Sequence, residues 1–130
     1  AMLVAFLIIK AAYDLTRESA KDLMDVGLPP EEVGWIKNLI ENHRPQIHGF
    51  HQLRTRKAGH FRFIEFHLKV DRHLTVETSH AITEDLTEHI EEHFPNSSVM
   101  IHIEPCDGKC SQKCLEGCFL NESQRQALKG

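Results

Sequence analysis

The first 105 residues of this 130-residue chain contain no cysteine, and we see no cleavable signal sequence. Both absences argue against a secreted disulfide framework, which would distribute cysteines through the fold. The formal net charge is -4, so no basic field is available to attract nucleic acid. The apolar run from Met2 to Ile9 is shorter than the roughly 20 residues that span a bilayer. We therefore expect reduced thiols in a cytosolic setting and no nucleic-acid partner.

Histidine is the residue type present in excess. Ten histidines are scattered from His43 to His102, whereas a purification tag would place them in one run. The length suits a single domain with a modest core. The question is therefore which histidines the fold brings together.

Two strand-like runs, His60–Val70 and Ser98–Pro105, carry histidines on one side of their alternating pattern. Alternate residues of a strand face opposite sides of the sheet, so each run has a core face and an open face. The residues predicted to face the core are Ile64, Phe66, Leu68, Val70, Val99, Ile101 and Ile103. The residues predicted on the open face are Phe63, Glu65, His67, Lys69, Met100, His102 and Glu104.

The open face thus combines His67, His102 and Glu104 if the two strands share a sheet. Two imidazoles and a carboxylate suit zinc or another divalent transition metal. The alternative is a pair of solvated histidines on a sheet surface, and we favour metal binding. Because a ligating imidazole must give a lone pair, binding should weaken as imidazole gains a proton at lower pH.

The remaining pattern predicts an α+β fold with the order α-β-β-α-β. Helices are expected from Pro30 to about His43 and from the N-cap Thr75 to Phe94, with a weaker strand at Ile47–Arg56 and a hairpin turn before His60. Alternation in that weaker strand places His51 on the core side, and a bulge or a twist at the strand end would have to turn it outward. Both helices should cover one face of a three-stranded sheet. The uncovered face predicts a homodimer that meets through it.

The chain divides into three parts: an N-terminal helix in residues 1–27, the α-β-β-α-β domain in residues 28–105, and a cysteine-rich tail in residues 106–130. The first part resembles the end of a membrane helix or a helix that packs on a partner, although a helix packed on the domain's own core fits the pattern about equally well. We expect the tail to be loosely ordered without a ligand. Its thiols, which form an accessory metal trap or an inert segment, are Cys106, Cys110, Cys114 and Cys118.

The motifs together resemble the cytoplasmic domain of cation diffusion facilitator (cation efflux) transporters. The similarity lies in His51–Gly59, Arg62–Leu68, the His80-Ala81 pair, Phe94–Asn96 and Ile101–Pro105. It covers about Met2 to Cys106, and the first segment looks like the end of the sixth membrane helix. It implies a ferredoxin-like, metallochaperone-like fold that dimerises as a V beneath the transmembrane domain, on the cytoplasmic side of the inner or plasma membrane.

The same resemblance implies a function and a set of ligands. Family members export divalent metal from the cytosol in exchange for protons, and zinc in their cytoplasmic domain is held by histidines and an acid. The partner subunit contributes the residue that matches His80, and the acid is glutamate here where the best-described relatives have aspartate. The matching positions are His51, His67, His80, His102 and Glu104.

These features predict a zinc-binding regulatory and dimerisation domain of a metal/proton antiporter. One alternative is a free-standing soluble metal buffer or metallochaperone derived from the family. A metallohydrolase would need an open metal position, a general base and a substrate pocket, and a flat sheet face offers little of the last. We therefore expect no enzyme and no catalytic residue.

Overall fold

The computed structural model describes residues 2–23 and 26–129. Its elements follow the predicted order, with two additional short helices in the tail. The N-terminal helix covers Met2–Leu23, and the rest of its predicted range includes residues 24 and 25, which lie outside the described residues. The elements are α1 (Met2–Leu23), α2 (Pro30–Asn42), β1 (Ile47–Ala58), β2 (Phe61–Asp71), α3 (Val76–His93), β3 (Ser97–Cys106), α4 (Gln112–Glu116) and α5 (Glu122–Ala127).

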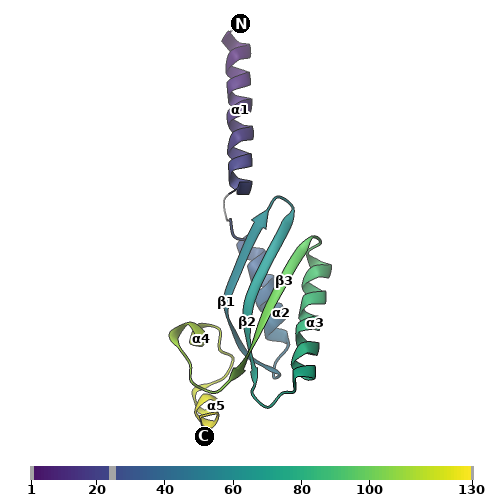
Figure 1. The fold of residues 1–130 in the computed structure, drawn as a ribbon. Coiled ribbons are helices and arrows are strands. Elements are labelled where there is room, and N and C mark those ends of the chain that lie inside the picture. The colour runs from purple at the N-terminus through teal and green to yellow at the C-terminus, as the bar shows by residue number, and fades with distance from the viewer. Residues whose placement is uncertain (1, 24–25, 130) are drawn as a thin grey trace.

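The three strands form one mixed sheet in the order β1-β2-β3 (Figure 1). The hairpin makes β1 and β2 antiparallel, whereas the crossover through α3 makes β2 and β3 parallel. The predicted α+β, ferredoxin-like fold is confirmed. Because β2 is central, its side chains meet those of both neighbours, and this strand organises both faces of the sheet.

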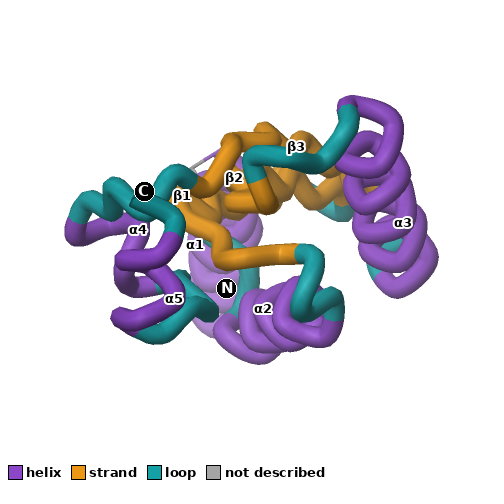
Figure 2. The backbone as a smooth tube through the Cα atoms, turned by 90° about the horizontal axis from the view of Figure 1, so that it is seen from below, coloured by secondary structure: helices purple, strands orange, loops and turns teal. Residues whose placement is uncertain are grey.

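The core lies between the sheet and the two helices α2 and α3, which cover the same face (Figure 2). The predicted inward residues of β2 are buried, and Phe66 and Leu68 have no exposed surface. Ile36 and Ile40 of α2 pack into the same cluster, as do three residues of α3 at helical spacing. Full burial of each such side chain contributes about 1.5–3 kcal/mol, which is why the alternation in β2 determined its orientation.

The helix α3 begins as predicted at the N-cap Thr75, whose hydroxyl accepts a hydrogen bond from the Thr78 N–H at 3.1 Å. A hydrogen bond joins the middle of α3 to the end of α2. The Asp85 carboxylate lies 2.6 Å from Nε2 of His43, and this hydrogen bond lowers the pKa of Asp85. His43 is the C-cap of α2, and its Nδ1 lies 2.9 Å from the Leu39 carbonyl oxygen in the last turns of that helix. The contact therefore joins the two helices at the edge of the core.

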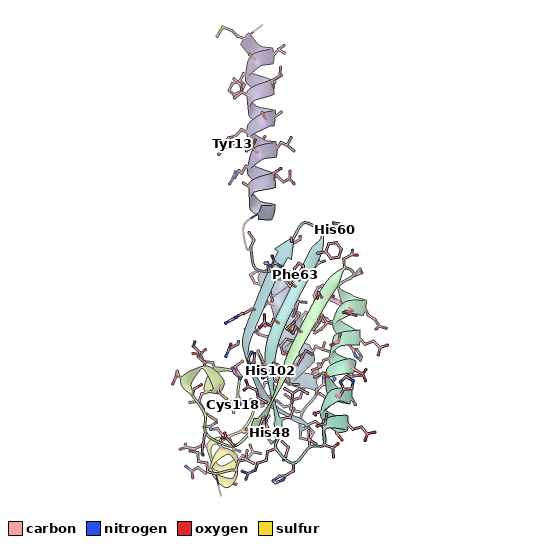
Figure 3. The ribbon with its side chains drawn as sticks, viewed as in Figure 1. Tyr13, His48, His60, Phe63, His102 and Cys118 are labelled. Carbon is pink, nitrogen blue, oxygen red and sulfur yellow. The ribbon has the colours of Figure 1, made fainter. Side chains whose placement is uncertain are left out.

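The helix α1 projects away from the sheet as a separate rod (Figure 1). Its apolar side chains are exposed, including Phe6, Ile9 and Tyr13, and Tyr13 is labelled in Figure 3. In the described part of the chain no helix is both long enough and apolar enough to cross a membrane. The segment after α1 first contacts the sheet at Val26, whose carbonyl accepts a hydrogen bond from the Lys57 N–H at 2.9 Å.

The tail differs from the loosely ordered segment that the sequence predicts, because it folds back onto β1. The Phe50 N–H donates to the Gly117 carbonyl at 3.0 Å, and the Phe119 N–H donates to the His48 carbonyl at 2.9 Å. The guanidinium of Arg44 lies 4.2 Å from the centre of the Phe119 ring. Composition gave no sign of this docking, since it uses the backbone groups of an edge strand, which any sequence carries.

Two glycines, Gly49 in β1 and Gly117 in the tail, make that docking possible. We expect Gly117→Ala to release the tail. A Cβ atom at Gly117 would lie 1.9 Å from the Phe50 carbonyl oxygen, which is closer than any real contact. The alanine should therefore speed proteolysis of the tail while leaving the thermal unfolding of the core nearly unchanged. Limited digestion with trypsin, followed by mass spectrometry, measures the first effect, and circular dichroism measures the second.

The matched control is Gly34→Ala inside α2, where a new Cβ atom would meet nothing within 4 Å. Alanine at a helix interior is favoured over glycine by about 1 kcal/mol. The control should raise the stability of the core and leave the digestion of the tail unchanged. Equal digestion of the Gly117→Ala variant and the unmodified protein would show that the tail is not held in this way.

Candidate metal centre

The parallel pairing of β2 with β3 places two histidines side by side on the open face. His67 is in register with His102, and Lys69 is in register with Glu104. The rings of His67 and His102 have centroids 4.8 Å apart. The alternation predicted this juxtaposition, and the parallel register adds Lys69 as a direct neighbour of the carboxylate.

His51 joins them because β1 contains two register shifts, one between Ile47 and Gly49 and one between His51 and Arg54. The strand pairs His51 with His67 and then Arg54 with Glu65, so two residues of β1 oppose one of β2. Gln52 absorbs the irregularity with a φ of 53°, a value that non-glycine residues rarely adopt. The earlier shift reverses the alternation after the buried Ile47, and the bulge at Gln52 restores it, so that His51 between them lies on the open face. Its ring centroid lies 5.0 Å from that of His67. Simple alternation was therefore wrong for this strand, and the bulge that the metal hypothesis requires is present.

The carboxylate of Glu104 is the centre of the cluster. One oxygen, Oε2, lies 3.0 Å from Nε2 of His51 and 2.7 Å from Nζ of Lys69, and the other, Oε1, lies 2.7 Å from Nδ1 of His67. Among the described residues, His51, His67 and Glu104 form the one group of three metal-ligating side chains whose ligand atoms all lie within 4.8 Å of one another.

The cations and N–H groups around Glu104 hold it strongly in the ionised form. Burial acts to raise the pKa of this carboxyl, but hydrogen bonds from Lys69, His67 and His51 outweigh burial and lower the pKa to about 2. Burial likewise acts to lower the pKa of Lys69, but its hydrogen bond with Glu104 and the attraction of nearby negative charges, that of Glu104 first, together raise it. The carboxylate is therefore an anion under all physiological conditions.

These donors fit a divalent cation such as zinc. To hydrogen bond to an ionised carboxylate, His51 and His67 must each carry a proton on the nitrogen that faces Glu104. A metal ion would take the place of those protons, because a ligating nitrogen must present its lone pair. The ammonium of Lys69 would then lose one of its partners. The hydrogen bonds to Glu104 thus keep the side chains that would ligate the ion close together.

The other two predicted ligands lie outside this group of three. His102 is 64% exposed, and its Nε2 is 3.9 Å from Oε1 of Glu104. Figure 3 shows it on β3 at the open face. His80 is 68% exposed on α3 and lies beside Glu84 at 3.3 Å. Within one chain, therefore, the fold brings three of the five predicted ligands together, places His102 at their edge, and leaves His80 facing outward.

Sequence reasoning placed Lys69 on the open face but did not identify it as part of the site. Its position two residues after His67 in an alternating strand was the available signal, because the parallel partner of Lys69 is Glu104. Lysine beside a buried carboxylate is common in ion pairs, so its presence alone indicates no metal.

The four tail cysteines are reduced and lie near one another without forming a three-ligand group. Cys106 and Cys114 are buried, whereas Cys110 and Cys118 are half-buried. Burial, with a further contribution from the neighbouring Cys110 thiol, raises the pKa of Cys114 to about 11. Only Cys114 lies within α4, so the four do not line one helix face.

The fold and the cluster define an α+β domain with histidines and a carboxylate gathered on an open sheet face. The family model described as "Cation efflux protein, cytoplasmic domain" matches residues 28–106. That range exceeds half of the chain, so the chain belongs to this family, which is one of transport proteins rather than enzymes. The predicted resemblance is confirmed, and residues 28–106 are a cytoplasmic domain.

Individual relatives agree with this assignment. The chain is 34% identical over 103 residues to the cation-efflux pump FieF of Citrobacter koseri, a match that covers 79% of this chain and 34% of FieF. The chain thus spans about a third of the length of the curated relatives it matches.

Solved structures show the same architecture. The Zn form of CzrB matches with a TM-score of 0.60 and 38% identity, over 68% of this chain and 100% of that one. The metal-bound C-terminal domain of the CzcD transporter from Thermotoga maritima matches with a TM-score of 0.52 and 25% identity, over 60% of this chain and 94% of that one.

Proposed function

We propose that this chain is a zinc-binding regulatory and dimerisation domain of a metal/proton antiporter of the cation efflux family. The observation that carries the proposal is the convergence of His51 and His67 on the Glu104 carboxylate. The zinc and metal-bound forms of CzrB and CzcD support it, since both relatives share this fold. No observation favours the alternative of a free-standing metal buffer.

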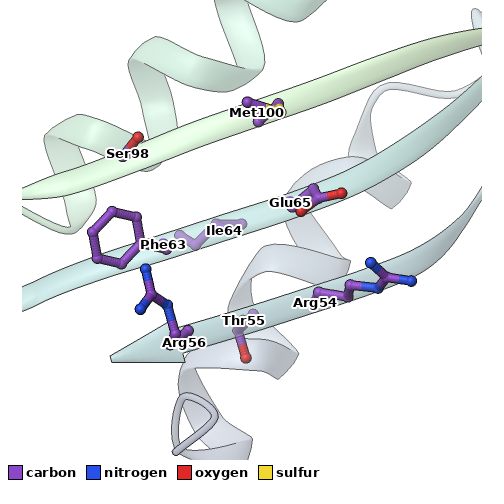
Figure 4. A pocket seen from close by; sticks show the side chains of 8 residues that line it. All are labelled: Arg54, Thr55, Arg56, Phe63, Ile64, Glu65, Ser98 and Met100. Atoms are coloured by element: carbon purple, nitrogen blue, oxygen red, sulfur yellow. The ribbon is translucent and has the colours of Figure 1, made fainter. Parts of the chain in front are cut away.

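The open sheet face supports the dimer part of the proposal. Phe63 is 37% exposed and Met100 is 67% exposed on this face. Beside them lies a hollow of about 480 Å³, where the guanidinium of Arg56 covers the Phe63 ring at 4.4 Å (Figure 4). An exposed apolar face rimmed by polar side chains is typical of an interaction surface. A second copy of the same chain is the occupant we propose, through a symmetric interface.

Zinc would then act by linking the two copies. His51, His67 and Glu104 of one copy would hold the ion, with His102 beside them, and His80 of the second copy would supply the remaining ligand. A ligand shifts an equilibrium only by its difference in affinity for the two states. A ligand from each copy gives that difference, because the full ligand set exists only when the copies are close. Bound zinc should therefore favour a closed pair.

Small-angle X-ray scattering with and without zinc tests this proposal. We expect zinc to reduce the radius of gyration of the dimer, and we expect His80→Ala to abolish the reduction while one ion per chain still binds at His51, His67 and Glu104. His89→Ala is the matched control, because His89 is an exposed histidine of the same helix and lies outside the cluster. It should respond to zinc like the unmodified chain. A dimer whose scattering is unaffected by bound zinc would refute the regulatory role.

A further inference from the structure

The tail is folded around its cysteines rather than around hydrocarbon side chains. The structure describes residues 106–129 of the tail. Within this range only Cys106, Gly108 and Cys114 are buried. Its largest apolar residues, such as Leu115 and Phe119, are exposed or half-buried. A segment of this size cannot build an adequate core, and small folds of this kind usually depend on disulfides or a bound metal.

The backbone brings the cysteine-bearing segments to one end of the sheet, where β1 begins and β3 ends. Cys106 ends β3, and Gly108 then reverses the chain with a φ of 75°, so that Cys110 returns toward it. Cys114 lies in α4, and Cys118 pairs with Gly49 of β1. Burial raises the pKa of both Cys106 and Cys114, and the Cys110 and Cys118 thiols add to this rise; Cys110 also shares a hydrogen bond with Cys114.

The turn at Gly108 is enforced by a second contact. A Cβ atom there would lie 2.4 Å from the Arg125 carbonyl oxygen, so the end of α5 closes directly over the turn. Cys110 also lines a cleft of about 200 Å³, together with Arg125 and Lys129. The cleft, which Glu122 also lines, gives an ion a path from solvent to Cys110.

We propose that Cys106, Cys110, Cys114 and Cys118 form a second metal site, separate from the histidine cluster, for a thiophilic divalent cation such as Zn²⁺ or Cd²⁺. Four thiolates around a dication give the closed tetrahedral arrangement of a structural site. Free thiols in a cytoplasmic domain remain available for this role, because that compartment keeps them reduced. The site goes beyond the proposed regulatory function, which uses nitrogen and oxygen ligands.

The ion must draw the sulfurs together. A metal–sulfur distance of about 2.3 Å in a tetrahedron places the sulfurs about 3.8 Å apart. In the described tail, no three thiols lie as close to one another as the ligand atoms of His51, His67 and Glu104, which are all within 4.8 Å. Cysteine has one side-chain torsion, and rotation between its staggered positions moves the sulfur without moving the backbone. Metal binding should therefore stiffen the tail as well as fill the site.

Cadmium titration of the whole chain, with all four thiols first shown to be reduced, tests the second site. We expect ultraviolet thiolate-to-cadmium absorption, and native mass spectrometry should count one ion more on the unmodified chain than on Cys110→Ser/Cys118→Ser. This pair spares the two buried cysteines, so the fold of the variant should be retained. Its affinity at the tail should fall at least about 100-fold, because loss of even an outer partner of a metal ligand costs 10–100-fold.

His51→Ala/His67→Ala is the matched control, because it removes ligands only from the histidine cluster. It should keep the thiolate absorption and the slowed amide exchange of residues 106–120 that cadmium produces. The proposal is overturned if reduced protein shows no thiolate absorption. It is also overturned if the serine variant, folded by circular dichroism, binds as many cadmium ions as the unmodified chain.

Discussion

Zinc affinity should fall at least about 100-fold when His51 and His67 are both replaced by alanine in a chain that also carries Cys110→Ser/Cys118→Ser. The serines remove the second site, so that the titration reports the histidine cluster alone. Both imidazoles lie within 3.0 Å of Glu104, and their loss leaves one carboxylate and the exposed His102. A single carboxylate does not compete with water for zinc at micromolar concentration, and even outer-shell changes at metal sites cost 10–100-fold.

Competition with a zinc-binding dye gives the dissociation constants needed for this comparison. The matched control is His60→Ala, which removes a histidine from the turn between β1 and β2, outside the cluster. It should bind zinc like the serine background. If the double alanine variant binds as tightly as the control, His51 and His67 are not ligands, and the proposed function loses the observation on which it rests.

Replacing Glu104 by glutamine should cost the metal-free domain roughly 3 kcal/mol of unfolding free energy near neutral pH. Hydrogen bonds from Lys69 and the two imidazoles lower the pKa of this carboxyl from 4.5 to about 2. Each unit of pKa corresponds to about 1.4 kcal/mol. A carboxyl whose pKa is depressed in the folded state stabilises the fold above its unfolded pKa, and this stabilisation is lost as pH falls.

The difference between the two proteins should therefore depend on pH in a defined way. It should be constant above pH 4.5, shrink as pH falls from 4.5 toward 2, and vanish below about 2. Urea unfolding at a series of pH values, in the presence of a chelator, measures it. Glu65→Gln is the control, because Glu65 of β2 lies on the same face of the sheet but outside the group around Glu104. A pH-independent difference would show that Glu104 contributes through packing and not through its charge.

Much of this protein follows from short patterns in its sequence. The alternation of apolar residues in β2 determined which side chains are buried, because burying the wrong face would expose four large apolar groups to water. The same alternation put His67 and Lys69 on one face, and Thr75 marked the start of α3. These features depend on neighbours within a few residues, which is why the sequence alone was sufficient to predict them.

The tertiary structure decided the rest. Two register shifts in β1, one on each side of His51, turned this side chain outward against the simple alternation, because the pairing with β2 changes register at both points. Parallel pairing with β3 made Lys69 the neighbour of Glu104. The tail docked on β1 because Gly49 and Gly117 let two backbones approach closely, a fit between segments almost 70 residues apart. Such contacts depend on how distant segments meet in space, and no local pattern records them.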